Sequence, residues 1–275
     1  MFSQEERNIT FLAAAYKNHT QRLRHIIDEA EININYVDEN GYSGLMLAMN
    51  NDFRTERNME TIHLLIEKGC DVSTRSTSGD MAIHLACRNG LSDVAEAILT
   101  KNPNVIHALS NGFSPLHLAI YYGNIDTAKL LISHDITIIN QKNSKDLSPL
   151  MISLARAIGT DLTSGALKEQ CKGFASYLLR DHLCYIKSDI NDPSHTGNTA
   201  LHIASYLGDC SIVESILKMG ATTTVENNNG KTAHDLARSE DVKSLIAVGS
   251  TIEEMVGRVE QATAEPLFKR ARTHE

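Results

Sequence analysis

The side chains in this sequence best suited to acid–base, nucleophilic or metal chemistry are a few histidines and cysteines. His84, His117 and His202 each lie three residues after the start of a related segment, "MAIHLA", "SPLHLA" and "TALHIA". An imidazole can act as a general base or bind a metal ion. Their chemistry therefore depends on whether these segments are separate sites or copies of one unit.

Two further clusters could bring a nucleophile and a base together. "DHLCY" carries His182 and Cys184 beside an irregular segment that holds Cys171, and "ENNNGKTAHD" carries His234 and Asp235. A neighbouring imidazole can activate a thiol, but neither cluster supplies a third orienting group or an oxyanion hole. The sequence also lacks the metalloprotease, nucleophile-elbow, P-loop and dinucleotide motifs. We therefore predict no catalytic residue, no metal site and no cofactor, with a Cys/His enzyme as the remote alternative.

The histidine segments are copies of a repeat. Related segments begin at Thr10, Ser43, Met81, Ser114, Ser148, Thr199 and Thr232, with spacings of 33, 38, 33, 34, 51 and 33 residues. A period near 33 is typical of a repeat array. Neighbouring copies would lie about 10 Å apart, so their histidines could not share a zinc ion with bonds near 2 Å. We predict that all three histidines are structural.

The fourth copy, residues 109–141, shows why the unit must stack. Ser114 and Pro115 are typical of a helix start, and Gly112 and Gly123 allow the positive φ of a turn and of a helix end. The apolar residues of "NIDTAKLLISHD" recur at helical spacing. Ordering one repeat costs roughly 33 to 66 kcal/mol of backbone entropy. About eight buried aliphatic side chains return only about 12 to 24 kcal/mol, so a repeat needs neighbours to fold.

This turn–helix–helix unit resembles the ankyrin repeat. The likeness rests on "NGFSPLHLAIYYG", "TGNTALHIASYLG" and "SGDMAIHLACRNG", and it extends over roughly residues 5 to 248. It implies an all-α solenoid of stacked helix pairs, with β-hairpin fingers projecting to one side. It also implies that His84, His117 and His202 bind the turn backbone and the adjacent Ser or Thr hydroxyl.

The resemblance divides the chain into seven repeats and a tail. The repeats are expected to start near residues 5, 38, 76, 109, 143, 194 and 227, forming one array over 1–248. Extra residues near 52–58 and 155–173 are expected to be loops, and the second could be a further recognition element. A capping helix is expected over 249–266, followed by a disordered basic tail over 267–275.

In ankyrin-like arrays the finger tips and the ends of the first helices are free to bind partners on the concave face. The fingers supply Asn40, Tyr42, Ser78, Asp80, Asn111, Phe113, Lys145, Leu147, His195 and Asn198, and the helix ends supply Asn50, Asn51, Arg88, Asn89, Tyr121, Tyr122, Tyr206 and Leu207. Aromatic residues and Arg dominate interface energies, and only 5% of this chain is aromatic. The resemblance therefore implies a non-catalytic protein–protein interaction module with an unidentified protein partner. Some of these tyrosines could instead pack against the adjacent repeat.

Composition limits the class of partner and the compartment. A formal charge of −8 disfavours a general nucleic-acid binder, and no apolar run is long enough to span a membrane. Five cysteines without a C-x-x-C pair indicate reduced thiols in an intracellular, cytoplasmic protein. We also expect the chain to be a monomer on its own. A bacterial effector acting in the cytoplasm of a eukaryotic host is an alternative, based on the polar, acidic tail. Nuclear localisation would depend on Lys269, Arg270 and Arg272.

Overall fold

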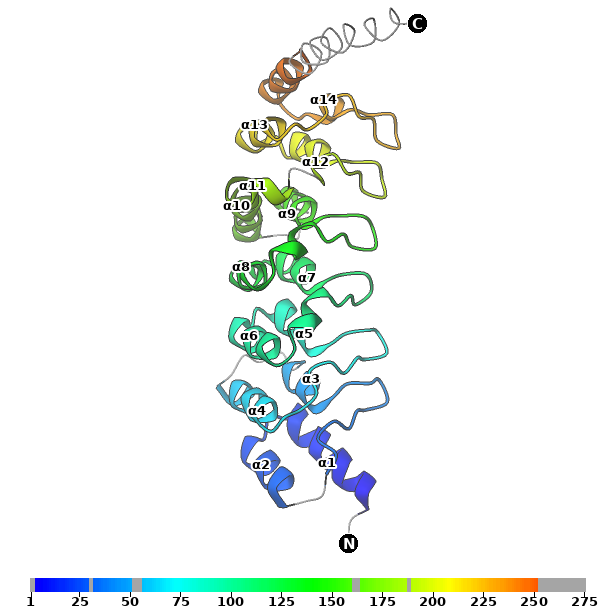
Figure 1. Ribbon diagram of the computed structural model, residues 1–275, viewed down its shortest axis with the longest axis vertical. Coiled ribbons are helices and arrows are strands. Elements are labelled where there is room, and N and C mark those ends of the chain that lie inside the picture. The colour runs from blue at the N-terminus through cyan, green and yellow to red at the C-terminus, as the bar shows by residue number, and fades with distance from the viewer. Residues whose placement is uncertain (1–2, 30–31, 51–55, 160–163, 187–188, 252–275) are drawn as a thin grey trace, which may run out of the picture. The chain divides into compact units, whose positions relative to one another are not determined.

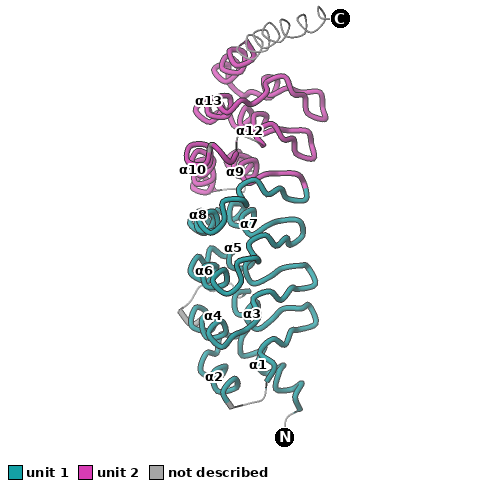
Figure 2. The backbone as a smooth tube through the Cα atoms, viewed as in Figure 1, with its two compact units in different colours: residues 1–144 teal, residues 145–275 magenta. Residues whose placement is uncertain are grey.

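The structure is a computed structural model that describes residues 3–29, 32–50, 56–159, 164–186 and 189–251. The chain divides into two compact units, residues 1–144 and 145–275, shown in Figure 2. Each unit is described by itself below.

Unit 1 is a stack of four helix pairs. In Figure 1 its first helices form one row, its second helices form another, and hairpin loops project from the side of the first helices. The first helices are α1 (Gln4–Tyr16), α3 (Gly44–Met49), α5 (Ala82–Asn89) and α7 (Pro115–Tyr121). The second helices are α2 (Thr20–Glu29), α4 (Glu56–Glu67), α6 (Ser92–Lys101) and α8 (Ile125–His134), and short 3₁₀ helices η1 (Pro103–His107) and η2 (Ile136–Asn140) follow α6 and α8.

The helix boundaries follow the local chemistry expected from the sequence. Ser114 caps α7, because its Oγ accepts a hydrogen bond from the His117 N–H at 3.4 Å, and Pro115 fills the first helical position. Gly90 ends α5 with φ 67°. On α8, the second helix of the pair that begins with α7, Ala128, Leu131 and Ile132 are buried as their spacing predicts.

The fingers are hairpin loops that hydrogen-bond to their neighbours. The Thr77 N–H donates to Asn40 O at 2.8 Å, and the Ser144 N–H donates to Gly112 O at 2.9 Å. In the finger at 110–113, both central residues have positive φ, 48° at Asn111 and 80° at Gly112, which is the two-residue turn that an Asn-Gly pair favours. Each such bond ties one finger to the next.

Unit 2 repeats the same plan with one enlarged pair. Its helices are α9 (Pro149–Ile158), α10 (Gly165–Asp181), α11 (Leu183–Ile186), α12 (Ala200–Leu207), α13 (Cys210–Lys218) and α14 (Ala233–Leu236), followed by a helical segment over 240–251. The α12 helix packs against α9, α13 and α14. Its finger bonds are of the same kind: the His195 N–H donates to Lys145 O at 3.0 Å, and the Asn228 N–H donates to Thr196 O at 3.1 Å.

The extra residues of the fifth repeat are largely helical rather than a loop. Residues 155–158 form the last turn of α9, and 165–173 form the first half of the 17-residue α10; residues 160–163 are outside the described part of the chain. The physical reason is an amphipathic period, since Cys171, Phe174, Ala175 and Leu178 are all buried on one side of α10.

The other irregular segments are only partly described. Of the extra residues near 52–58, those from 56 onward begin α4, and the rest lie outside the described ranges. Residues 249–251 belong to the helical segment that begins at 240. The remainder of the expected cap, 252–266, and the tail, 267–275, also lie outside the described ranges.

The structure shifts the register of the first repeat by one residue. Asn18 has φ 54° at the end of α1, where Gly90 and Gly123 end α5 and α7 with φ 67° and 77°. The bond from the His19 N–H to Ala14 O (3.0 Å) matches the bond from the Asn124 N–H to Ala119 O (2.8 Å). Ala14 is therefore the equivalent of Ala119, and the first copy of the motif begins at Ile9 instead of Thr10. An Asn in place of Gly at the helix end concealed this register in the sequence.

Candidate partner-binding face

The three repeated histidines hold each finger to its helix. The Nδ1 atom of His84 accepts the Met81 N–H at 3.1 Å, and its Nε2 lies 3.1 Å from Ala108 O at the base of the next finger. His202 bonds in the same way to the Thr199 N–H (3.2 Å) and to Lys231 O (3.1 Å). Because Nδ1 accepts a backbone N–H, the proton of the neutral ring is on Nε2. Burial lowers the pKa of His84 and of His202.

His117 makes the equivalent Nδ1 contacts at the start of its own helix. Its Nδ1 lies 3.2 Å from the Ser114 N and 2.7 Å from the Ser114 Oγ. The ring of Phe113 meets the imidazole edge-on, with centroids 6.4 Å apart. Phe113, proposed from sequence as a finger-tip contact, is therefore half-buried against its own turn.

The remaining finger residues divide into exposed and inward-facing positions. Asn40, Ser78 and Asn111 of unit 1 and Lys145 and His195 of unit 2 are exposed. Tyr42, Leu147 and Asn198 are half-buried. The exposed set is small and polar.

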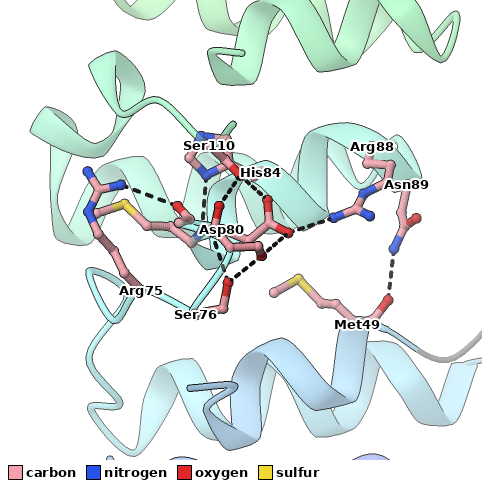
Figure 3. Close-up of polar contacts among 11 residues, drawn as sticks. Met49, Arg75, Ser76, Asp80, His84, Arg88, Asn89 and Ser110 are labelled. Carbon is pink, nitrogen blue, oxygen red and sulfur yellow. Dashed lines mark hydrogen bonds and ion pairs between the residues drawn. The ribbon is translucent and has the colours of Figure 1, made fainter. Parts of the chain in front are cut away.

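Asp80 differs from the other finger positions because it is buried, with 9% exposure. Figure 3 shows its carboxylate held between two fingers: Ser110 Oγ donates to Oδ1 at 2.5 Å, and Arg88 from α5 approaches Oδ2 at 3.4 Å. The Asp80 N–H donates to Ser76 Oγ at 3.0 Å. In this conformation Asp80 orients Arg88 and joins the fingers, so a partner would meet Arg88 rather than the carboxylate.

The ends of the first helices carry the exposed aromatic surface of unit 1. Tyr121 and Tyr122 at the end of α7 are 42% and 48% exposed, and their rings pack edge to face with centroids 5.3 Å apart. Asn50 is exposed, and Arg88 and Asn89 are half-buried. Asn51 lies outside the described residues.

Tyr16 and Lys17 belong to the same positions and were missed by the sequence analysis. With the first repeat beginning at Ile9, Tyr16 is equivalent to Arg88 and Tyr121, and Lys17 is equivalent to Asn89 and Tyr122. Tyr16 is 47% exposed, close to the exposure of Tyr121. A search for a residue that tolerates positive φ at the end of α1 would have pointed to Asn18 and so to this register.

Side-chain amides join these helix ends from repeat to repeat. The Asn18 amide lies 3.5 Å from Ala48 O, the Asn89 amide donates to Met49 O at 2.8 Å, and the Asn124 amide donates to Arg88 O at 2.8 Å. Figure 3 shows the Asn89–Met49 bond. These bonds place the ends of α1, α3, α5 and α7 next to one another in order. We call the residues that they present the helix-end row: Tyr16, Lys17, Asn50, Arg88, Asn89, Tyr121 and Tyr122.

Unit 2 has a single aromatic at the equivalent position. Tyr206 is 42% exposed at the end of α12, and the Arg238 guanidinium lies 4.2 Å from the centre of its ring. Leu207 beside it is half-buried. One face of this tyrosine is therefore already covered by a cation.

In the Cys–His cluster that is the remote catalytic alternative, the imidazole of His182 bonds to a tyrosine. His182 Nε2 lies 2.9 Å from the Tyr177 hydroxyl, and the two rings meet at 82°. Cys184 is exposed, and Cys171 is one of the buried residues of α10. Asp235 of the second cluster caps α14, where it accepts the Thr232 N–H at 2.9 Å, and this bond lowers the pKa of Asp235. Among the described residues, no group of three or more His, Cys, Asp and Glu is placed to hold a metal ion.

Comparison with known families matches these repeats directly. A family model described as "Ankyrin repeats (3 copies)" covers residues 53–146, and the model "Ankyrin repeat" covers residues 196–228. The chain contains ankyrin repeats. The family and the all-α ankyrin solenoid expected from the sequence are confirmed, as is the repeat character of the chain. Ankyrin-repeat proteins generally act as protein–protein interaction modules, and the fold is typically non-enzymatic.

The ankyrin-repeat relatives are distant in sequence. The chain is 28% identical over 156 residues to a putative ankyrin repeat protein, FPV031, of fowlpox virus, covering 54% of this chain and 44% of that protein. It is 26% identical over 235 residues to the homolog of transient receptor potential cation channel subfamily A member 1 of Caenorhabditis elegans, covering 84% of this chain and 17% of that protein. The chain thus spans less than half the length of either relative.

A solved structure supports the ankyrin fold. The human ASB11 ankyrin repeat domain superposes with a TM-score of 0.57 at 18% identity, covering 87% of this chain and 96% of that chain. Within the described ranges, the ankyrin chain has no helix that is long and apolar enough to cross a membrane.

Proposed function

We propose that this chain is a non-catalytic interaction module that binds a partner protein through its finger tips and the ends of its first helices. The observation that carries the proposal is the exposure of Tyr121 and Tyr122, two adjacent large side chains about half exposed on a rigid helix end. Fixed aromatic side chains lose little entropy on binding and are frequent interface hot spots. The chain has few aromatic residues, so their concentration at first-helix ends is informative.

The interior of the protein supports an intracellular setting for this module. Cys70, Cys87 and Cys171 are buried free thiols, and burial raises the pKa of Cys70 to about 12. Such thiols persist in reducing compartments. The proposed location is therefore the cytoplasm, where the partner would also be found.

Affinity capture with the intact chain and with the Tyr121→Ala, Tyr122→Ala double variant tests this function. The double variant is expected to lose about 2–4 kcal/mol of binding free energy while its thermal unfolding stays close to that of the wild type. Tyr185→Ala is the matched control, because Tyr185 is 49% exposed but belongs to α11, which is not a first helix. Lower stability with unchanged partner affinity would show that the tyrosine pair only packs against its neighbours.

A further inference from the structure

The helix-end row of unit 1 differs in charge from the chain as a whole. Its residues are three tyrosines, two asparagines, Lys17 and Arg88, with no carboxylate, whereas the chain carries a formal charge of −8. Asp80, a carboxylate that contacts the row, is buried and bonded to Ser110. Several exposed acidic residues of unit 1 lie on second helices, such as Glu60 and Glu67 on α4 and Glu96 on α6. Glu5 and Glu6 lie in the first turn of α1, at the opposite end of that helix from Tyr16, and Glu39 lies on a finger.

Arg88 is the cation best prepared to receive a ligand. Its guanidinium is held from one side by Asp80 at 3.4 Å, and a third of its side chain remains exposed. Arg presents several donors in a fixed plane, so a guanidinium already oriented by one carboxylate can bind a second one with little loss of entropy. The Tyr121–Tyr122 pair lies at the end of α7, the first helix of the next repeat. The Asn124 amide, just after this pair, donates to the Arg88 carbonyl and so joins the two helix ends.

From this arrangement, and resting on the proposed function, we infer that the helix-end row binds an extended acidic segment of the partner protein. A carboxylate of that segment bonds to Arg88, and apolar side chains on either side pack on Tyr121 and Tyr122 and on Tyr16. Two isolated cations on an acidic chain are too few to neutralise the phosphates of a nucleic acid, so a polypeptide with a single well-placed carboxylate fits the charge better.

The repeat spacing sets the spacing of the ligand side chains. Packed helices are about 10 Å apart, and an extended chain advances about 3.3 Å per residue, so one repeat corresponds to about three ligand residues. The carboxylate is therefore expected about three residues from the apolar residue on Tyr121 and Tyr122. The apolar residue on Tyr16, two repeats away from Arg88, is expected about six residues from the carboxylate on its other side.

Selection of random 16-residue peptides on the full-length chain tests the inference. Enriched peptides are expected to contain Asp or Glu with a large apolar residue about three residues away on one side and a second apolar residue about six residues away on the other side. In fluorescence anisotropy, Arg88→Gln should raise the Kd of such a peptide roughly tenfold. Replacing the peptide's acidic residue by its amide should cost a similar factor with the wild type and little with Arg88→Gln.

Two variants separate this binding from effects on folding. Asp80→Asn removes the negative charge that competes for Arg88 but keeps an amide oxygen that can still orient the guanidinium, so it should bind the peptide as well as the wild type or more tightly. Tyr16→Ala should weaken binding of the full peptide severalfold and leave unchanged the binding of a truncated peptide that spans only Arg88 to Tyr122.

Enriched peptides without acidic residues, no enrichment at all, or an affinity that is indifferent to Arg88→Gln would each overturn the inference. The proposed function fails separately, if the Tyr121→Ala, Tyr122→Ala variant captures the same partner equally well.

Discussion

The Ser110 hydroxyl lies 2.5 Å from the Oδ1 atom of Asp80, and this bond joins two neighbouring fingers through a buried charge. A carboxylate that is 9% exposed depends on such donors, because burial without them destabilises the ionised form. The same carboxylate orients Arg88, so one bond contributes both to the stacking of repeats and to the geometry of the helix-end row.

Removing this donor should destabilise unit 1. Ser110→Ala is expected to lower the free energy of unfolding by about 1–3 kcal/mol, because Asp80 loses its shortest hydrogen bond. Urea denaturation followed by circular dichroism measures the change. Ser144→Ala is the control in the next finger, where the serine is exposed and a change within about 0.5 kcal/mol is expected. Equal effects of the two substitutions would contradict this role of Ser110.

The buried histidines should make the protein sensitive to mild acid. Burial lowers the pKa of His84 and of His202 below the ordinary value of 6.5, so the unfolded chain binds more protons than the native state as the pH falls through this range. Their contribution to stability is complete above about pH 6.5 and is lost as the pH falls toward the folded-state pKa, by about 1.4 kcal/mol for each unit of pKa difference.

Urea unfolding at pH 7.5, 6.5 and 5.5 measures this loss. Asp135, Asp209 and Asp235, whose pKa values are also lowered, release their contributions only below about pH 4, so they do not obscure the window. His84→Gln should be less stable at pH 7.5 and should lose less stability on acidification than the wild type. An unchanged pH slope in this variant would assign the acid sensitivity to other groups.

The cysteines should differ widely in their reaction with alkylating reagents. Cys184 is exposed, whereas Cys70, Cys87 and Cys171 are buried, and burial raises the pKa of each of these three thiols. Because the thiolate is the reactive species, iodoacetamide should modify Cys184 at least tenfold faster than the buried set. Peptide mass spectrometry over time checks the order, and urea should remove the difference. Fast labelling of Cys87 in the native state would indicate that the α5 layer opens readily.

Substitution of two different glycines by alanine should change the stability of the protein in opposite directions. Gly173 is exposed in the middle of α10 with no atom within 4 Å of an added Cβ, so Gly173→Ala should stabilise the protein by roughly 0.5–1 kcal/mol. Gly41 has φ 76°, and its added Cβ would lie 3.0 Å from Arg75 O, so Gly41→Ala should destabilise by about 1–2 kcal/mol. Thermal melting measures both changes. Destabilisation by Gly173→Ala would contradict the helical assignment of residues 165–173.

The sequence by itself determined the repeat family and the plan of each unit, because those depend on local chemistry. The caps at Ser43 and Ser114, the glycine stops at Gly90 and Gly208 and the helical spacing of aliphatic residues all act within one repeat. The exposed position of Tyr121 and Tyr122 followed from the same pattern, since residues at a helix end beside a glycine are rarely needed for packing. The helical period of α10 is also present in the sequence, in residues that the comparison of repeat lengths assigns to an inserted loop.

Only the tertiary structure decided the features that depend on contacts between repeats. Asp80 looks like an exposed finger tip in sequence, but Ser110, thirty residues later, covers its carboxylate. Tyr16 entered the helix-end row only once the backbone of Asn18 and the bond from His19 to Ala14 set the register of the first repeat. In both cases the physical reason is that burial and alignment arise where one repeat packs on the next, and a local pattern carries no information about that contact.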